Sequence, residues 1–163
     1  MKRLLLLFLV LCLALCSCDK ESVEADNVLN NIIENEKALP VGQIYRKGAE
    51  EGKDDYLSGN MIGILYGVKA ESEYFSMLED YAIYLSSFAK PFEVAVFKCY
   101  SKSDVDSISK LCFLRGDIIK SLINHEKGNE DISVKVISKG RYVCMYVGTD
   151  SEGAERAFMN KVG

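Results

Sequence analysis

A long amphipathic segment between two pairs of strand-like segments most constrains the fold of this chain. Ser103, Asp104 and Asp106 open the segment, and such residues cap free amides and suit the positive end of a helix dipole. The spacing predicts one helix from Ser103 that frays near Asn124. Its predicted buried side, which Ile118 and Ile123 broaden, consists of Val105, Ile108, Cys112, Ile119 and Leu122.

The two flanking pairs are rich in β-branched and aromatic residues, which favour strands. Residues 81–87 and 92–100 predict one pair around the turn 89–91, and residues 133–137 and 142–148 predict the second. Gly140 supplies the positive φ that a tight hairpin between the second pair requires. The strands that begin at Phe92 and Tyr142 are apolar on both faces, Lys98 and Arg141 excepted. We expect these two strands to lie between helices or against a partner.

Shorter helical segments lie at the two ends of this pattern. Apolar residues recur at a spacing of four from Val28 to Ile33, Ser58 opens a short helix that Gly67 ends, and Asp150 caps a last helix. The sequence therefore predicts an α+β fold with two layers: a mostly antiparallel, four-stranded sheet in a ββαββα core, with helices packed on it and N-terminal helices before it.

The first residues look like a lipoprotein signal. Lys2 and Arg3 precede an apolar run, and Ser17 is followed by Cys18. This is the layout of a secretory signal, and the run of about a dozen residues is shorter than the roughly 20 that cross a bilayer. We expect a signal peptide over 1–17, a diacylglyceryl group on Cys18, a tether over 18–25 and one globular domain over 26–163. The expected location is the extracytoplasmic face of the cell membrane.

Charge and cysteine content narrow the classes of partner. The chain of 163 residues has a formal charge of −4, which becomes −6 when Lys2 and Arg3 leave with the signal. No basic cluster is present to neutralise phosphates, so a nucleic-acid partner is not expected.

Once the signal peptide is removed, the cysteines that remain in addition to Cys18 are Cys99, Cys112 and Cys144. Buried free thiols are the first interpretation, and a Cys99–Cys144 bridge is the alternative.

Candidate catalytic and metal-binding residues are few. His125 has no matched nucleophile in the sequence, so a surface position at a helix end is the expectation. Glu50, Glu51, Asp54 and Asp55 lack the spacing of an EF-hand loop and predict a solvated loop. The tripeptide 115–117 reads Arg-Gly-Asp, but it falls inside the long helix, where its glycine suits a close packing contact. We expect no catalytic residues, cofactor or metal.

Tyrosines offer one candidate binding face. Tyr142 and Tyr146 should share one face of the sheet, and Tyr100 on the other hairpin would extend it. A row of exposed rings would suit a glycan or a partner protein. Core packing is the other interpretation of the same residues.

Several local motifs carry a family resemblance. They are Leu39–Tyr45, Asp55–Ser58, Leu65–Gly67, Asp80–Ser87, Phe92–Lys98 and Gly140–Val143. With the signal, these segments resemble a family of small lipoproteins from low-GC Gram-positive bacteria that carry a domain of unknown function. The resemblance implies a location at the membrane and no particular chemistry. We therefore expect a non-enzymatic accessory domain that binds an envelope protein, with a wall-polymer or ligand-binding module as the alternative.

Overall fold

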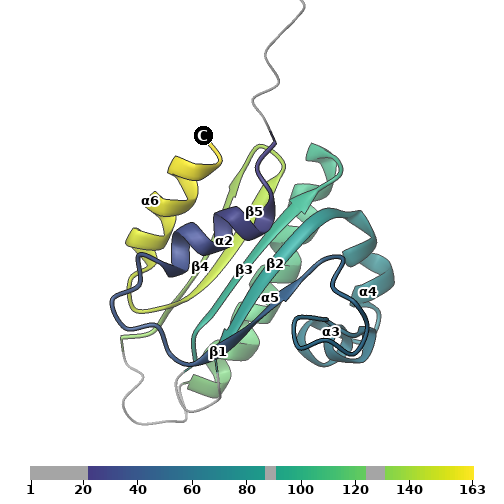
Figure 1. The fold of residues 1–163 in the computed structure, drawn as a ribbon, viewed down its shortest axis with the longest axis horizontal. Coiled ribbons are helices and arrows are strands. Elements are labelled where there is room, and N and C mark those ends of the chain that lie inside the picture. The colour runs from purple at the N-terminus through teal and green to yellow at the C-terminus, as the bar shows by residue number, and fades with distance from the viewer. Residues whose placement is uncertain (1–21, 87–90, 124–130) are drawn as a thin grey trace, which may run out of the picture.

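The computed structural model describes residues 22–86, 91–123 and 131–163. Its centre is a five-stranded, fully antiparallel sheet in the order β1-β2-β3-β5-β4 (Figure 1). The strands are β1 (Gly42–Arg46), β2 (Leu78–Ser86), β3 (Glu93–Cys99), β4 (Ser133–Lys139) and β5 (Tyr142–Gly148). The α-helices are α2 (Ala25–Ile33), α3 (Gly59–Tyr66), α4 (Ala70–Glu73), α5 (Val105–Ile123) and α6 (Ser151–Lys161). Two short 3₁₀ turns, Phe75–Met77 and Lys102–Asp104, precede β2 and α5.

The α+β class and the antiparallel sheet predicted from sequence are confirmed, but the sheet has five strands instead of four. The additional strand, β1, pairs with β2 from Gly42 opposite Ser86 to Arg46 opposite Ala82. It escaped prediction because it has only five residues and includes Gln43 and Arg46. The N-terminal helices are present, with β1 lying between α2 and α3.

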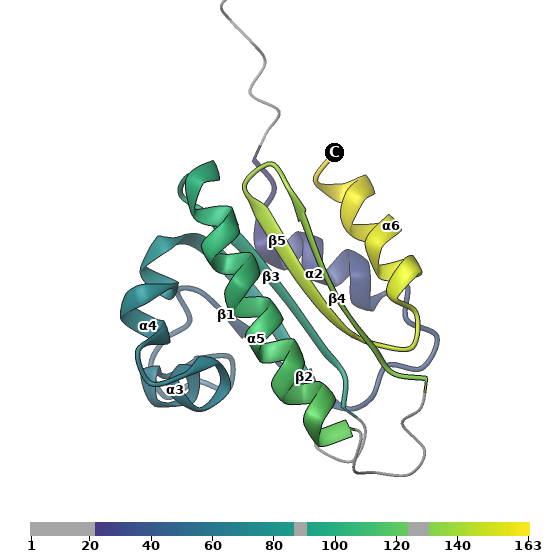
Figure 2. The same cartoon turned by 180° about the vertical axis from the view of Figure 1, so that it is seen from behind.

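The prediction of two layers is wrong, because helices cover both faces of the sheet. Figure 1 shows α2 and α6 on one face, and Figure 2 shows α5 on the other. The cause lies in the central strands: every residue of β3 is buried, as is β5 from Val143 to Gly148. Burying a strand on both faces requires a helix layer on each side. The two-sided apolar character of these strands was therefore the better guide to the architecture.

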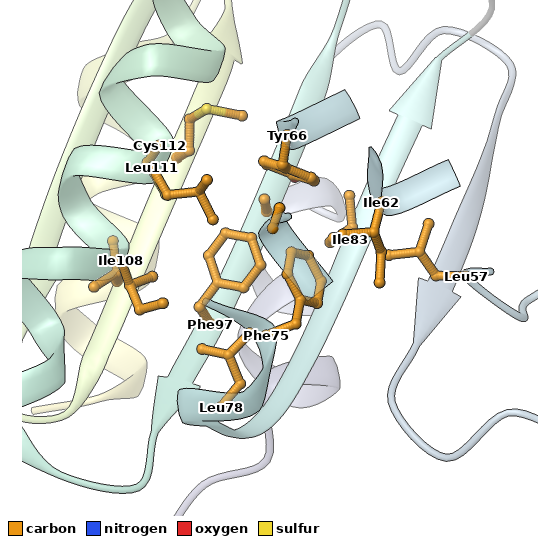
Figure 3. Close-up of a cluster of buried hydrophobic side chains, with 14 of the residues drawn as sticks. Leu57, Ile62, Tyr66, Phe75, Leu78, Ile83, Phe97, Ile108, Leu111 and Cys112 are labelled. Carbon is orange, nitrogen blue, oxygen red and sulfur yellow. The ribbon is translucent and has the colours of Figure 1, made fainter. Parts of the chain in front are cut away.

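The first core lies between the sheet and the layer that contains α3 and α5, which we call the α5 layer. Tyr66, Phe75 and Phe97 form its aromatic centre, with ring centroids of Phe75 and Phe97 5.9 Å apart. Figure 3 shows residues from both helices and the sheet around these rings. The labelled residues are Leu57, Ile62, Tyr66, Phe75, Leu78, Ile83, Phe97, Ile108, Leu111 and Cys112.

The second core lies between the sheet and the pair α2 and α6. Val28, Leu29 and Ile32 of α2 pack here with Phe158 of α6. The Asn31 amide donates to the Ala157 carbonyl at 2.9 Å and so joins the two helices. The folded part begins inside the predicted tether, because Ala25 is fully buried.

Helix caps agree with the sequence in two places and differ in one. The Ser58 hydroxyl accepts from the Met61 amide at 3.2 Å, and the Asp150 carboxylate accepts from the Gly153 amide at 2.8 Å. Ser103, by contrast, does not cap α5. Ser101 and Asp104 instead form a capping box around the preceding 3₁₀ turn.

Gly116 lies where α5 crosses β4, and this close packing confirms the expectation for that glycine. A Cβ added there would lie 2.6 Å from Val134 Cγ1. Such a separation is too short for van der Waals contact, and the β-branched Val134 has little rotamer freedom to move away. The absence of a side chain at 116 therefore sets how closely α5 approaches the edge of the sheet.

We predict that Gly116→Ala lowers the free energy of unfolding by about 1 kcal/mol. Overpacking costs about 1–3 kcal/mol, which exceeds the roughly 1 kcal/mol that alanine gains over glycine inside a helix. In a Val134→Ala background, Gly116→Ala should instead raise the free energy of unfolding. The clash is removed there, and the higher helix propensity of alanine remains. Urea unfolding of the four proteins measures both effects. A loss of equal size in both backgrounds would contradict the packing explanation.

Candidate functional site

The three tyrosines of the predicted binding face do not form one exposed row. Tyr146 has no exposed area, and its hydroxyl donates to Glu36 Oε1 at 2.7 Å and accepts from the Asp150 amide at 3.0 Å. The half-buried Tyr142 donates to the Val23 carbonyl at 2.5 Å. Both rings therefore hold neighbouring segments onto the sheet, and only Tyr100, just beyond β3, is mostly exposed.

The cysteines of the described residues are buried free thiols, as first expected. Cys99 lies in the core of the α5 layer and Cys144 in the core beneath α2 and α6. The alternative of a bridge between them is wrong, because their side chains point to opposite faces of the sheet. Burial raises the pKa of Cys99 to about 11 and that of Cys144 to about 12. Both thiols therefore stay protonated near neutral pH and behave as small apolar groups.

Other candidates from the sequence are placed as follows. Glu50, Glu51, Asp54 and Asp55 lie in the loop between β1 and α3. Within the described ranges, no group of three or more acidic, histidine or cysteine side chains is placed to hold a metal ion. His125 and Cys18 lie outside the described residues. The same ranges hold no helix of the length and apolar character that a bilayer span requires.

A buried polar cluster that sequence reasoning missed joins α5 to the sheet. The Arg115 guanidinium faces the Glu93 carboxylate of β3, donating from Nη2 to Oε2 at 2.7 Å and from Nε to the same oxygen at 3.1 Å. The Tyr66 hydroxyl of α3 donates to Glu93 Oε1 at 3.3 Å. Two helices of the α5 layer and the strand β3 thus meet at one carboxylate.

The cluster is fully paired, which permits its burial. Among the described residues, no buried side-chain nitrogen or oxygen lacks a hydrogen-bond partner. Burial raises the pKa of Tyr66, and the Glu93 charge raises it further. Burial opposes the charge of Arg115, but Glu93 raises the pKa of Arg115 overall. The signal in the sequence was a single acidic residue, Glu93, at the start of a strand that is apolar except for Lys98.

The ion pair fixes which side of α5 faces the sheet. Successive residues of an α-helix are rotated by about 100°, so an inward Arg115 turns Leu114 outward. The buried positions on the C-terminal half are Gly116, Ile119 and Ile123. The expectation that Leu122 and Ile118 lie on the buried side is therefore wrong, since Leu122 is 59% and Ile118 48% exposed.

These outward residues form an apolar stripe, which we define as Leu114, Ile118 and Leu122. Leu114 is 60% exposed, similar to the other two. A spacing of four places the three side chains along one side of the helix, one turn apart. Their exposure shows that no part of the described chain covers them, and α5 lies on the outer side of the sheet (Figure 2).

We predict that Arg115→Met lowers the free energy of unfolding by roughly 3–5 kcal/mol, because it leaves the Glu93 charge buried without its partner. Adding Glu93→Gln should recover part of this loss, since the amide still accepts from Tyr66. Thermal and urea unfolding measure both variants. The control is Arg156→Met, whose exposed ion pair with Glu152 contributes little. Equal losses for Arg115→Met and Arg156→Met would contradict the assigned role.

Comparisons with known proteins found no relative of this chain. No family model, curated protein or solved structure matches the chain. The function of the chain is therefore inferred from its own residues.

Proposed function

We propose that this chain is a lipoprotein anchored to the outer face of the cell membrane, whose folded domain is a non-enzymatic accessory module that binds another envelope protein through the apolar stripe. The signal peptide would cover 1–17, and a diacylglyceryl group on Cys18 would supply two-chain anchoring, which is stable where a single chain is not. The basic residues, apolar run and Ser17-Cys18 pair in the sequence support this part.

The apolar stripe is the observation that carries the binding proposal. Single apolar residues on a surface are ordinary, but three aligned aliphatic side chains, each close to half exposed or more, form a continuous ridge over about 12 Å of helix. Water contact with such a ridge is unfavourable, and covering it would stabilise a complex. An unpaired ridge of this kind is typical of a surface that another molecule covers.

The chemistry of the stripe indicates what would cover it. Leu114, Ile118 and Leu122 offer neither hydrogen-bond donors nor aromatic faces. A wall glycan carries many hydroxyl groups that would lose their hydration against this surface, whereas an apolar helix face of a partner protein would not. The occupant we propose is therefore a helix of an envelope protein with its own aliphatic face.

The alternative, a glycan- or ligand-binding module, has less support in the geometry. Of the three tyrosines on the predicted binding face, Tyr146 is buried and Tyr142 is engaged with Val23. Tyr100 remains 59% exposed, with the Lys47 ammonium 5.2 Å from its ring centroid. One exposed ring is a small platform for a polymer.

Site-specific photo-cross-linking in cells tests the proposal. A photoreactive residue at Ile118 should give one discrete adduct with a membrane protein, because this position lies on the stripe. The same residue at Glu152, on exposed α6 across the sheet, should not form that adduct. Leu114→Asp combined with the Ile118 probe should abolish it, since a charge within the ridge opposes apolar contact.

The anchor has its own control in the same experiment. Cys18→Ala should shift the protein out of the membrane fraction and reduce the adduct from Ile118. An adduct that forms equally from Ile118 and Glu152, or that survives Leu114→Asp unchanged, would contradict the stripe as the binding surface. Recovery of wall polymer from the wild type without any protein adduct would favour the glycan module.

A further inference from the structure

A second exposed face of α5 carries an ordered pattern of charge. Five exposed residues recur along it at spacings of four and three, and we call them the charged row: Asp106, Lys110, Phe113, Asp117 and Lys120. This spacing keeps side chains on one side of a helix, as in the contact line of paired helices. The row lies beside the apolar stripe around the helix, since Phe113 and Ile118 are about 140° apart around the helix axis.

The signs of the charges reverse symmetrically about the middle of the row. Read along the helix they are negative, positive, the Phe113 ring, negative and positive. An antiparallel copy of the same helix, centred on Phe113, would set Asp106 against Lys120 of the second copy. The same arrangement would set Lys110 against Asp117 of the second copy. A parallel copy in register would set every charge against a like charge.

We propose that the chain forms a homodimer in which two α5 helices pair antiparallel along the charged row. The contact is isologous, so each of the two kinds of ion pair occurs twice. The two Phe113 rings meet at the two-fold axis, where an aromatic pair stabilises the contact by more than its buried area alone would. Phe113 is 55% exposed in the single chain, so pairing removes a large ring from water.

Charge complementarity favours a second copy as the occupant of this face. The chain has a net charge of −4, which opposes association in general, whereas the charged row has two acidic and two basic residues and no net charge. Asp117 and Lys120 are 4.0 Å apart within one helix and are 76% and 55% exposed. A contact so exposed contributes little and leaves both groups available. A contact of one helix pair is small, so the dimer is expected to be weak and concentration-dependent.

Charge exchange within the row tests this proposal. The full chain, in a mild density-matched detergent, is examined by sedimentation equilibrium over a range of concentrations. Lys110→Asp or Asp117→Lys alone turns two attractive contacts into repulsive ones and should raise the dimer dissociation constant about tenfold. The double variant with both substitutions restores opposite charges and should return the constant toward the wild-type value. Mixing the two single variants should give a heterodimer tighter than either homodimer.

Two control variants separate this contact from other causes. Leu122→Ser, on the apolar stripe, should leave dimerisation unchanged, and Phe113→Ser should weaken it without altering the unfolding temperature. Higher salt should weaken the wild-type dimer, because exposed charges are screened. A wild-type chain that stays monomeric at every concentration would overturn the proposal. The proposal would equally be overturned if the single charge changes left the dimer dissociation constant unchanged, or if the double variant failed to restore it.

Discussion

The buried salt bridge between Glu93 and Arg115 is the interaction on which the outward face of this protein depends. It joins the middle strand β3 to the longest helix, and Tyr66 of α3 completes it. Removing two charges from water is expensive, so a buried pair of this kind adds little net stability compared with apolar packing. What it does is select one rotation of α5: any other rotation would leave the Glu93 carboxylate without its partner. The apolar stripe and the charged row are outward in the rotation of α5 that places Arg115 inward.

How far the sequence predicts this fold depends on whether the information is local. The hairpin strands and the long helix follow from periodicity and turn residues within each segment, and the glycine in Arg115-Gly116-Asp117 was correctly linked to close packing. The second helix layer was implied by strands that are apolar on both sides. β1 was missed because a five-residue edge strand with Gln43 and Arg46 owes its existence to pairing with β2, which lies more than thirty positions further along the chain.

The candidate site was less predictable for a related reason. Apolar residues occupy both 118–119 and 122–123, so helical periodicity alone allows either Ile118 and Leu122 or Ile119 and Ile123 to face the sheet. Two contacts between α5 and the sheet decide between them, namely Arg115 with Glu93 and Gly116 with Val134. Likewise, nothing local distinguishes a core tyrosine such as Tyr146, held by Glu36 and Asp150, from a displayed one. These choices are made by long-range partners, and one of them, Glu93, is the single acidic residue of its strand.

Thiol labelling of α5 tests this rotation most directly. Cysteine is introduced singly at Ile118 or at the adjacent Ile119, and its reaction with a water-soluble reagent is followed in the native protein, with buried Cys112 as internal reference. The account predicts rapid labelling at 118, near the rate of a free thiol, and strong protection at 119, similar to Cys112. Protection at 118 with rapid labelling at 119 would mean that α5 is rotated so that Ile118 and Leu122 face the sheet. The apolar stripe would then belong to the core, and the proposed binding surface would not exist.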